Sequence, residues 1–422
     1  MTETTPSQTT SPPVEFVARQ HWNNWSGQAT ANPAFTVYPA SEQEVEEAVR
    51  FALTHQLPVR PVGSGHSWTP LCSTPGIMID LRNLKGVRIV DRERKRVAVK
   101  AGTTIFELGE ALWDEGFSLK NQGDIDVQTI AGALSTGTHG SGARLGVLAS
   151  SVYAVRLVDG RGNLVEITEE QPEHLKAAQV SLGLLGVITE VELEVVDRYY
   201  LEEEVTYPTW QDLLDGWDSD VADNHHSSWF WFPRNDSPER WGIPVPDEEP
   251  MADRAHLRRI NVAEGPARQV DSERRVDRNY LIYRGEFDGP YYEMELFVPA
   301  ARAREAVTRI RTLLQETLTH EKYPVQPRWV QADEIYLSPA YGTDSVGISI
   351  GGDSSTEYEA FFRKVDHLLS DLGARMHWGK IHFLDRQRVA ALYPEFETFQ
   401  RVRRNFDPNG IFLNAYGRDI FG

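Results

Sequence analysis

Three glycine-rich stretches in the N-terminal half constrain the fold of this chain more than any other feature of its sequence. They are PVGSGHSW at 61–68, NQGDIDVQTIAGALSTGTHGSG at 121–142 and SLGLLG at 181–186. Closely spaced glycines let the backbone adopt positive φ angles and turn its amide N–H groups to one side, and such concavities bind phosphate oxygens. A single phosphate needs one loop, so three loops favour a long ligand with a diphosphate and two ring systems. The alternative is that the glycines serve only hairpin turns.

The first of these stretches places a histidine directly after its glycines. Apolar residues at 57–62 predict a strand that leads into Gly63, and His66 follows Gly65. A histidine in this position would be held beside whatever the loop binds. Taken alone, PVGSGHSW is compatible with a surface turn as well as with an anion-binding loop, because short motifs produce many false matches.

The periodicity around these loops predicts an α+β region. Ser41 and Glu44 form a capping box ahead of a one-sided apolar stripe, which predicts a helix up to about residue 56. Farther on, YLIYRGEF at 280–287 and YYEMELFVP at 291–299 alternate as half-buried strands do, whereas the charged stretch 236–278 predicts a long loop. The resulting division is a disordered tail at 1–17, an N-terminal domain at 18–197, a second α+β domain at 198–372 and a packed C-terminal segment at 373–422.

Charge and cysteine content exclude several classes of function. The chain has 62 acidic against 43 basic residues, a net charge of −19 that disfavours binding to nucleic acid or to anionic membranes. No segment is apolar enough to cross a bilayer, and the polar N-terminus is not a signal peptide, so we expect a cytoplasmic protein. The single cysteine, Cys72, excludes an intramolecular disulfide and a thiolate metal cluster.

Common catalytic motifs are absent from the sequence. The spacing of His66, His139, His377 and His382 matches no compact metal motif, so we predict no metal site. A P-loop, a GxGxxG dinucleotide fingerprint and a nucleophile elbow are also missing. Arg328 and Lys380 each stand close to a tryptophan on an apolar stretch. From their local sequence alone, both are compatible with ordinary cations in water whose stems are packed.

Several stretches together resemble the vanillyl-alcohol-oxidase superfamily of FAD enzymes, in its aldonolactone and alditol oxidase branch. PVGSGHSW is similar to the flavin-attachment loop of that branch, AGALSTGTHGSG to its pyrophosphate-binding loop, and LGLLGVITEVEL to its strand against the adenosine side. Further matches are NWSG, SPAYGTDSV, HWGK and DPNGIFLNAY, so the resemblance runs from about Trp22 to Gly422.

This resemblance implies a two-domain α+β FAD-linked oxidase. A PCMH-type FAD domain would be assembled from the N-terminal part and residues 373–422, with a substrate domain of antiparallel sheet and covering helices inserted between them. The FAD would be attached covalently through its 8α position to His66. A second, cysteinyl attachment is not expected, because residues 121–142 contain no cysteine.

The resemblance also implies which residues form the site. Catalytic roles fall to Arg328, Lys380, Gln326, Ser349 and Asp124, with the two cations placed near the flavin and the substrate hydroxyls. A fixed cation there stabilises the negative charge that develops during hydride transfer to the flavin, and Lys380 could orient or help deprotonate the reacting hydroxyl. The residues expected to contact the cofactor are Pro61, Val62, Gly63, Ser64, Gly65, His66, Ser67, Gly123, Asp124, Thr129, Gly132, Thr136, Gly137, Thr138, His139, Gly186, Val187, Ile188, His377 and Lys380.

Three substrate-side positions depart from the branch. Gln326 stands where a glutamate usually precedes the arginine by two residues, and an amide can orient a hydroxyl but cannot take its proton. Ser349 replaces a histidine of alditol oxidases, and Asp124 replaces a serine, which makes Asp124 an alternative base. The flavin half therefore matches the branch better than the substrate half does.

We therefore expect a FAD oxidase that transfers hydride from an alcohol carbon of a polyol, sugar lactone or related hydroxylated metabolite to the flavin, with O2 reduced to H2O2. Gly123 falls at the position of a gate residue for oxygen, and its lack of a side chain favours an oxidase. The alternatives are a dehydrogenase of the same family that uses another acceptor, and a non-catalytic flavin- or carbohydrate-binding protein.

Overall fold

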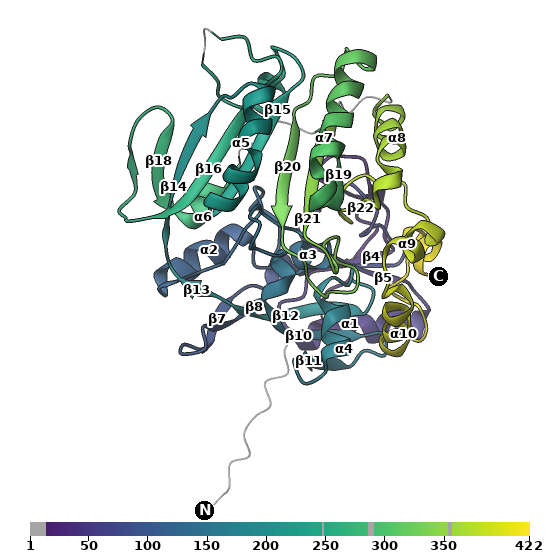
Figure 1. Ribbon diagram of the computed structural model, residues 1–422. Helices are drawn as coiled ribbons and strands as arrows, with labels where there is room; N and C mark the ends of the chain where they lie inside the picture. The colour runs from purple at the N-terminus through teal and green to yellow at the C-terminus, as the bar shows by residue number, and fades with distance from the viewer. Residues whose placement is uncertain (1–13, 247–248, 286–290, 353–356) are drawn as a thin grey trace, which may run out of the picture.

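Two sheet-containing regions lie one above the other in this protein (Figure 1). The computed structural model describes residues 14–246, 249–285, 291–352 and 357–422. In the view of Figure 1, the lower region holds the chain up to residue 197, and the upper region holds one large sheet. The C-terminal helices return to the lower region.

Up to residue 197, the described part of the lower region contains two larger sheets and the helices α1 to α4. One sheet has the strand order β1-β4-β6-β5, with parallel pairing of β4, β5 and β6, and the other has the antiparallel order β11-β10-β12-β8-β7. The bounds are β1 Val17–Ala18, β4 Phe35–Val37, β5 Val59–Val62, β6 Ile77–Asp80, β7 Val87–Asp91, β8 Arg96–Lys100, β10 Val152–Asp159, β11 Leu164–Thr168, β12 Gly186–Glu194, α1 Glu42–His55, α2 Ile105–Asp114, α3 Ile130–Ser135 and α4 Pro172–Gln179. Two short ladders pair β2 (Trp22–Asn23) with β3 (Thr30–Ala31) and β9 (Phe117–Ser118) with β13 (Val196–Asp197).

The upper region is a nine-stranded antiparallel sheet with helices on one face. Its strand order is β17-β18-β14-β16-β15-β20-β21-β19-β22. The bounds are β14 Tyr200–Thr206, β15 His226–Phe232, β16 Arg254–Ala263, β17 Arg268–Gln269, β18 Arg274–Arg278, β19 Tyr292–Pro299, β20 Val325–Val330, β21 Ser345–Gly352, β22 Arg375–Met376, α5 Trp210–Asp223, α6 Asn279–Tyr283, α7 Ala303–Thr312 and α8 Tyr358–Leu368. The sheet therefore spans 200–376, slightly past the predicted boundary at 372.

Alternation along the central strands decides which side chains face the helices. Trp329 of β20 packs edge-on against Trp217 of α5, with ring centroids 5.2 Å apart. Successive side chains of a strand point to opposite faces. Gln326 and Arg328, which are two residues apart, therefore share the face of β20 opposite Trp329, and both line a cavity there. The register thus directs polar side chains toward the lower region.

The C-terminal segment is packed, as its composition predicted, and it lies against the lower region. Its helices are α9 (Arg386–Leu392), α10 (Phe396–Phe406) and α11 (Ala415–Phe421). The side-chain amide of Asn414 donates to the carbonyl oxygens of Pro70, Leu71 and Ser73 at 2.8, 3.2 and 2.9 Å. Buried Arg60 in turn donates to the carbonyl oxygen of Phe412 at 2.7 Å, so the two ends of the chain are tied together.

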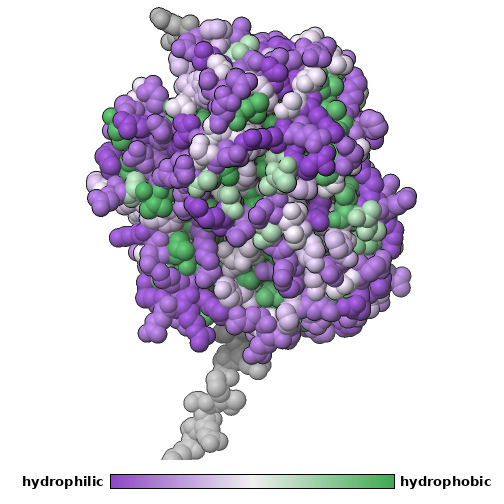
Figure 2. Space-filling view, in the orientation of Figure 1, coloured by the Kyte–Doolittle hydropathy of each residue, from purple (hydrophilic) through white to green (hydrophobic). Residues whose placement is uncertain are grey.

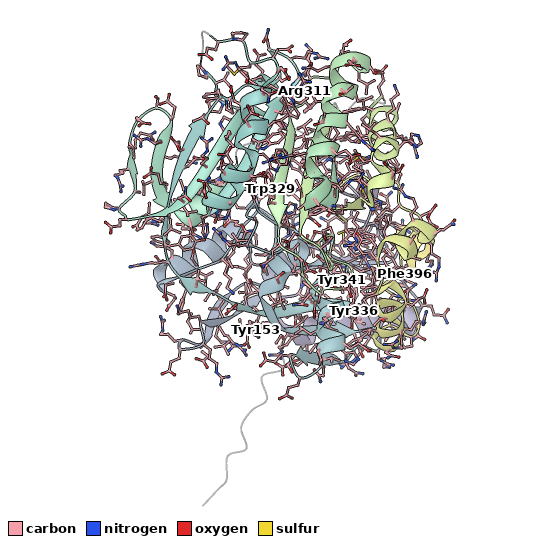
Figure 3. The ribbon with its side chains drawn as sticks, viewed as in Figure 1. Tyr153, Arg311, Trp329, Tyr336, Tyr341 and Phe396 are labelled. Carbon is pink, nitrogen blue, oxygen red and sulfur yellow. The ribbon has the colours of Figure 1, made fainter. Side chains whose placement is uncertain are left out.

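Segment 331–344 ties the upper sheet to the lower region. Figure 3 shows Trp329 at the lower end of β20, with Tyr336 and Tyr341 below it toward Phe396. The hydroxyl of Tyr341 donates to Glu395 at 3.3 Å, and the amide of Gly142 donates to the carbonyl oxygen of Trp329 at 2.9 Å. These bonds fix β20 above the second glycine-rich loop.

The predicted disordered tail extends too far along the chain. Its residues 1–13 lie outside the described ranges, whereas residues 14–17 are packed. Phe16 contacts Phe51 with ring centroids 4.3 Å apart, and Val17 pairs with Thr36 in the ladder of β1 and β4. An apolar contact and a short ladder therefore order the chain before residue 18.

Two further sequence predictions are wrong. The expected loop at 236–278 contains β16 and β18, because Glu203 forms ion pairs with Arg258 at 2.5 Å and Arg275 at 2.7 Å across the sheet. Arginines of this charged stretch are therefore paired with a glutamate of the neighbouring strand rather than exposed to water. The strand expected at 280–287 is the short helix α6 up to Tyr283, and its last two residues lie outside the described ranges.

The surface gives few further indications of function. On the face drawn in Figure 2, hydrophilic residues dominate and hydrophobic ones occur in small separate groups. Within the described ranges, no helix is long and apolar enough to cross a membrane. In the same part of the chain, no group of three or more His, Cys, Asp or Glu side chains is arranged to hold a metal ion.

Candidate active site

The three glycine-rich stretches converge on one cavity, which we call the loop cavity. Residues from 60–72, 128–136 and 182–188 line it, and it encloses about 830 Å³ of empty space. It begins where β5 ends and where α3 and β12 begin. The three stretches thus line a single cavity.

Glycine is required at two positions of the first loop. A Cβ atom on Gly63 would lie 2.0 Å from Oγ1 of Thr129, so the first and second loops touch only because this side chain is absent. Gly65 has a φ of +67°, in the left-handed region that favours glycine. Close approach and positive φ together shape the floor of the loop cavity.

The first loop also leaves its hydrogen-bond donors available. Within the described part of the chain, the backbone N–H groups of residues 64–67 form no hydrogen bond, while Ser64 is held by a bond from its hydroxyl to the carbonyl oxygen of Val127 at 2.5 Å. Successive free N–H groups in a glycine-shaped turn can bind phosphate oxygens. The loop cavity therefore fits the diphosphate of a dinucleotide cofactor.

His66 stands at the edge of the loop cavity as a neutral imidazole. Its ring stacks on Trp25 with centroids 5.1 Å apart. Burial, assisted by the charge of Lys380, lowers the pKa of His66 to about 4. A neutral ring keeps a lone pair on one nitrogen at physiological pH, as a nucleophile or a point of covalent attachment requires.

A second cavity, which we call the charged cavity, lies under the central strands of the upper sheet. It encloses about 490 Å³ of empty space. Its lining residues are Gly123, Asp124, Ile125, Gln128, Thr138, His139, Trp241, Tyr291, Glu293, Glu295, Gln326, Arg328, His377 and Lys380. It therefore collects ionisable side chains from segments more than 200 residues apart in the sequence.

Arg328 is the central cation of the charged cavity. It donates to Glu295 at 2.7 Å and lies 3.5 Å from Asp124, which also accepts a bond from Gln326 at 3.1 Å. Burial opposes the charge of Arg328, but Glu295 and Asp124 more than offset this, and the pKa of Arg328 is raised. Its buried Nε atom has no hydrogen-bond partner within the described residues.

Glu295 is an acceptor shared by two donors. Besides the bond from Arg328, its Oε1 atom lies 2.9 Å from Nε2 of His139, whose Nδ1 contacts the carbonyl oxygen of Gly140 at 2.8 Å. Burial opposes ionisation of this carboxyl group, yet Arg328 and His139 hold the pKa of Glu295 well below its usual range. Glu295 therefore remains a carboxylate that fixes both neighbours.

Lys380 belongs to a second charged group. It forms an ion pair with Glu293, whose other oxygen accepts the hydroxyl of Ser349. The Lys380 ammonium also lies 4.4 Å from the centre of the Trp68 ring. These contacts place a carboxylate and a cation side by side in the charged cavity.

His377 separates the two charged groups. Burial lowers its pKa to about 3, although Glu295 opposes the shift. Its Nδ1 atom accepts the backbone N–H of Gly379 at 3.0 Å, so the hydrogen of the neutral ring is on Nε2. His377 can therefore donate to a ligand but cannot accept a proton from one.

A third space, the bridging cavity, connects the other two. His66 and Thr136 line it together with the loop cavity, and Lys380, His377 and Tyr291 line it together with the charged cavity. Side chains of the free-donor loop and of the charged groups therefore line the bridging cavity together.

Most residues implied by the resemblance line these cavities, and three do not. Val187 is buried in the core because the alternation of β12 turns it away from Gly186 and Ile188, which face the loop cavity. Gly137 serves the turn after α3, where its φ is +77°. Ser349 is fully buried and reaches the site only through its bond to Glu293.

The sequence interpretation missed Glu293 and Glu295. Both occur in YYEMELFVP, which was interpreted only as an alternating strand. Residues two apart on a strand share a face, so two glutamates at this spacing among buried apolar residues indicate a polar site. That signal was present in the sequence.

Comparisons with known proteins agree with this architecture. A family profile described as a FAD binding domain matches residues 33–168, and one described as D-arabinono-1,4-lactone oxidase matches residues 245–420. L-gulono-1,4-lactone dehydrogenase of Mycobacterium tuberculosis is 32% identical over 425 residues, covering 95% of this chain and 99% of the relative. L-gulonolactone oxidase of Bos taurus is 28% identical, covering 95% and 98%.

Solved structures support the fold. Cholesterol oxidase from Brevibacterium sterolicum superposes with a TM-score of 0.84 at 14% identity, covering 100% of both chains. 6-Hydroxy-D-nicotine oxidase from Arthrobacter nicotinovorans gives 0.73 at 17% identity, covering 96% of this chain and 98% of that one. With its full-length relatives and its two matching profiles, this chain belongs to the aldonolactone oxidases and dehydrogenases, which are FAD-dependent oxidoreductases.

Proposed function

We propose that this enzyme oxidises a hydroxyl-bearing carbon of a sugar-derived lactone. The observation that carries the proposal is the bridging cavity, which joins the free-donor loop at His66 to the charged groups at Lys380 and His377. The relatives named for gulonolactone and arabinonolactone support a lactone as the substrate class. Residues 18–197 and 373–422 would hold the FAD, and residues 198–372 would cover the substrate.

The residues of the charged cavity would bind and orient the substrate. FAD, when bound, supplies a hydride acceptor. Arg328 and Lys380 provide fixed positive charge where negative charge develops, and such preorganised groups need no reorientation during the reaction. The Gln326 amide, held by Asp124, presents its polar group to a substrate hydroxyl.

We also propose that the FAD is attached covalently through His66. The neutral, partly buried ring at the junction of the loop and bridging cavities supports this. Acid precipitation of the wild-type protein should carry the yellow colour into the pellet, and precipitation of His66→Ala should release it into the supernatant. Flavin that stays with the precipitated variant would mean that the attachment lies elsewhere.

For the electron acceptor we propose O2, which would be reduced to H2O2. Gly123 lines the charged cavity, and a Cβ atom on it would lie 3.1 Å from the carbonyl oxygen of His139 and 3.3 Å from Thr138. Even an alanine side chain at position 123 would therefore narrow the path that we propose for O2. We expect Gly123→Ala to slow oxygen uptake more than it slows dye reduction, because only the small gas depends on that opening.

A dehydrogenase that uses another acceptor is the second candidate, because the relative from Mycobacterium tuberculosis carries that name. Oxygen uptake measured beside reduction of an artificial dye separates the two. Turnover with the dye and none with oxygen would favour the dehydrogenase.

Anaerobic mixing with a substrate panel tests the proposed reaction itself. L-gulono-1,4-lactone, D-arabinono-1,4-lactone and an open-chain polyol would each be mixed with the purified holoenzyme. We expect at least one lactone to bleach the visible absorbance of the oxidised flavin. A flavin that no member of the panel bleaches would favour a non-catalytic binding protein.

A further inference from the structure

We infer that Glu293 accepts the proton of the substrate hydroxyl, an inference that rests on the proposed function. Oxidation of an alcohol carbon removes a hydride from carbon and a proton from oxygen. The amide of Gln326 cannot take that proton. A proton acceptor must therefore come from another side chain of the charged cavity.

The contacts of the other candidates exclude them one by one. Glu295 is held by Arg328 and His139, and the two ring nitrogens of His139 are engaged by Glu295 and the carbonyl oxygen of Gly140. His377 uses its only lone-pair nitrogen to accept the N–H of Gly379. His139 and His377 have no acceptor site left for a hydroxyl proton. The second oxygen of Glu295 has no partner within the described residues, but that side chain is fully buried, with 0% of its surface exposed.

Asp124 is the remaining competitor, and donors surround it. It accepts from Gln326 at 3.1 Å, lies 3.5 Å from Arg328, and has Arg258 at 4.0 Å from its other oxygen. Two guanidinium groups and an amide thus stabilise its charge. Such a carboxylate suits substrate orientation better than proton uptake.

Glu293 is differently placed. Its partners are one flexible ammonium, that of Lys380, and two hydroxyls, those of Ser349 and Tyr291. It lines the charged cavity from β19, while Lys380 also lines the bridging cavity that His66 opens onto. Among the described residues, Glu293 is therefore the carboxylate that pairs with Lys380, the cation that lines both cavities.

The register explains how a glutamate on β19 reaches this position. β21 lies between β19 and β20, and Ser349 of β21 pairs with Gln326 on one side and with Glu295 on the other. The short side chain of Ser349 leaves room for Glu293 to extend over β21 and donates a bond to its carboxylate. Gln326 and Ser349 are two of the three positions that depart from the branch. Where they stand, the neighbouring strand β19 supplies a carboxylate, that of Glu293.

The proposed step balances in atoms and charge. A carboxylate oxygen of Glu293 would take the O–H proton of the substrate, and the carbon–oxygen bond would become a carbonyl. Bound FAD would supply the oxidant that accepts the hydrogen and electron pair of the C–H bond as hydride. A carboxylate is a weak base, but the hydroxyl becomes strongly acidic as the hydride departs.

Glu293→Gln tests this role because it keeps the shape and the acceptor oxygen that faces Lys380. Mixed anaerobically with L-gulono-1,4-lactone, the variant should still show the flavin spectral shift of substrate binding, with a Kd within about threefold of wild type. Its flavin reduction should be slower by about 10²–10⁴-fold, the usual contribution of a general base. The acid limb in the pH profile of reduction should disappear.

Two matched variants guard the interpretation. Asp124→Asn should mainly weaken substrate binding and keep the acid limb. Glu293→Asp retains a proton acceptor, so it should keep the acid limb and reduce its flavin at least about tenfold faster than Glu293→Gln. Flavin content and the thermal midpoint of each variant show whether the fold is intact.

The outcomes separate the two proposals. A wild-type flavin that no lactone reduces would contradict the proposed function and this inference with it. A normal wild type with an equally fast Glu293→Gln would overturn the inference alone. Loss of the acid limb in Asp124→Asn but not in Glu293→Gln would assign the proton to Asp124 and also overturn it.

Discussion

The loop cavity and the charged cavity recognise their ligands by opposite means. The loop cavity is built from backbone groups and small side chains, and glycines at 63 and 65 let two loops approach each other. The charged cavity is built from long ionisable side chains, with three carboxylates close to Arg328 and Lys380. A change in the first should therefore cost cofactor binding, and a change in the second should leave the cofactor bound but slow the chemistry.

Removal of the central cation is expected to have the largest effect. Arg328→Met leaves buried Glu295 with only His139 as a partner, and breaking a buried ion pair typically costs on the order of 3–5 kcal/mol. Urea unfolding of the variant should show a loss of this size in the free energy of unfolding. Arg328→Lys, which keeps the charge, serves as the control and should lose less. A loss below about 1 kcal/mol in Arg328→Met would contradict the role given to this pair.

Acidification should destabilise the folded protein because two of its buried histidines are neutral. One of them lines the charged cavity, and the other lies farther along the C-terminal segment. Burial lowers the pKa of His377 to about 3 and that of His382 to about 4, below the ordinary value of 6.5. Between the lowered and the ordinary pKa values, the unfolded chain binds more protons than the folded chain does. The free energy of unfolding is therefore greatest above about pH 6.5 and falls as the pH drops toward 4. Thermal midpoints measured from pH 7 to pH 4 check this.

His382→Gln isolates one part of that pH dependence. The ring of His382 contacts the hydroxyl of Tyr416 at 2.6 Å, and a glutamine amide can replace that contact. A shift of about 2.5 pKa units corresponds to about 3 kcal/mol between pH 7 and pH 4. The stability curve of the variant should be flatter by about that amount. An unchanged slope would mean that His382 does not titrate on unfolding.

The loop cavity should respond through space rather than charge. Gly63→Ala places a methyl group 2.0 Å from the Thr129 hydroxyl, and overpacking of this kind costs about 1–3 kcal/mol. We expect the variant to bind less flavin per protein, as measured from its visible absorbance. Adding Thr129→Gly removes the clash and should restore most of the flavin. No rescue would show that the loss does not come from this contact.

The contrast between the cavities also explains what the sequence could predict. The loop cavity depends on local glycine patterns, so PVGSGHSW and the stretch at 121–142 indicated it directly. The capping-box pattern at Ser41 likewise marked a helix that does form. A binding site made of backbone is encoded by a few adjacent residues. Its position could therefore be predicted without knowing how the strands pair.

The charged cavity depends on strand register, which short sequence patterns do not specify. Glu293 meets Ser349 and Lys380 only because β19 pairs with β21 in the observed alignment. A shift of one residue would turn both glutamates of β19 toward the helices. The same limitation hid β16 and β18, whose arginines seemed typical of a loop until their pairing with Glu203 was known.

The most direct test of this account is the electron density of the FAD-bound enzyme. We predict that one FAD extends through the loop cavity, with its diphosphate at residues 63–67 and its ring system in the bridging cavity between His66 and Lys380. The charged cavity would then lie against the reacting face of the ring. A flavin ring placed away from His66, Lys380 and Arg328 would contradict the assignment of the two cavities to one active site.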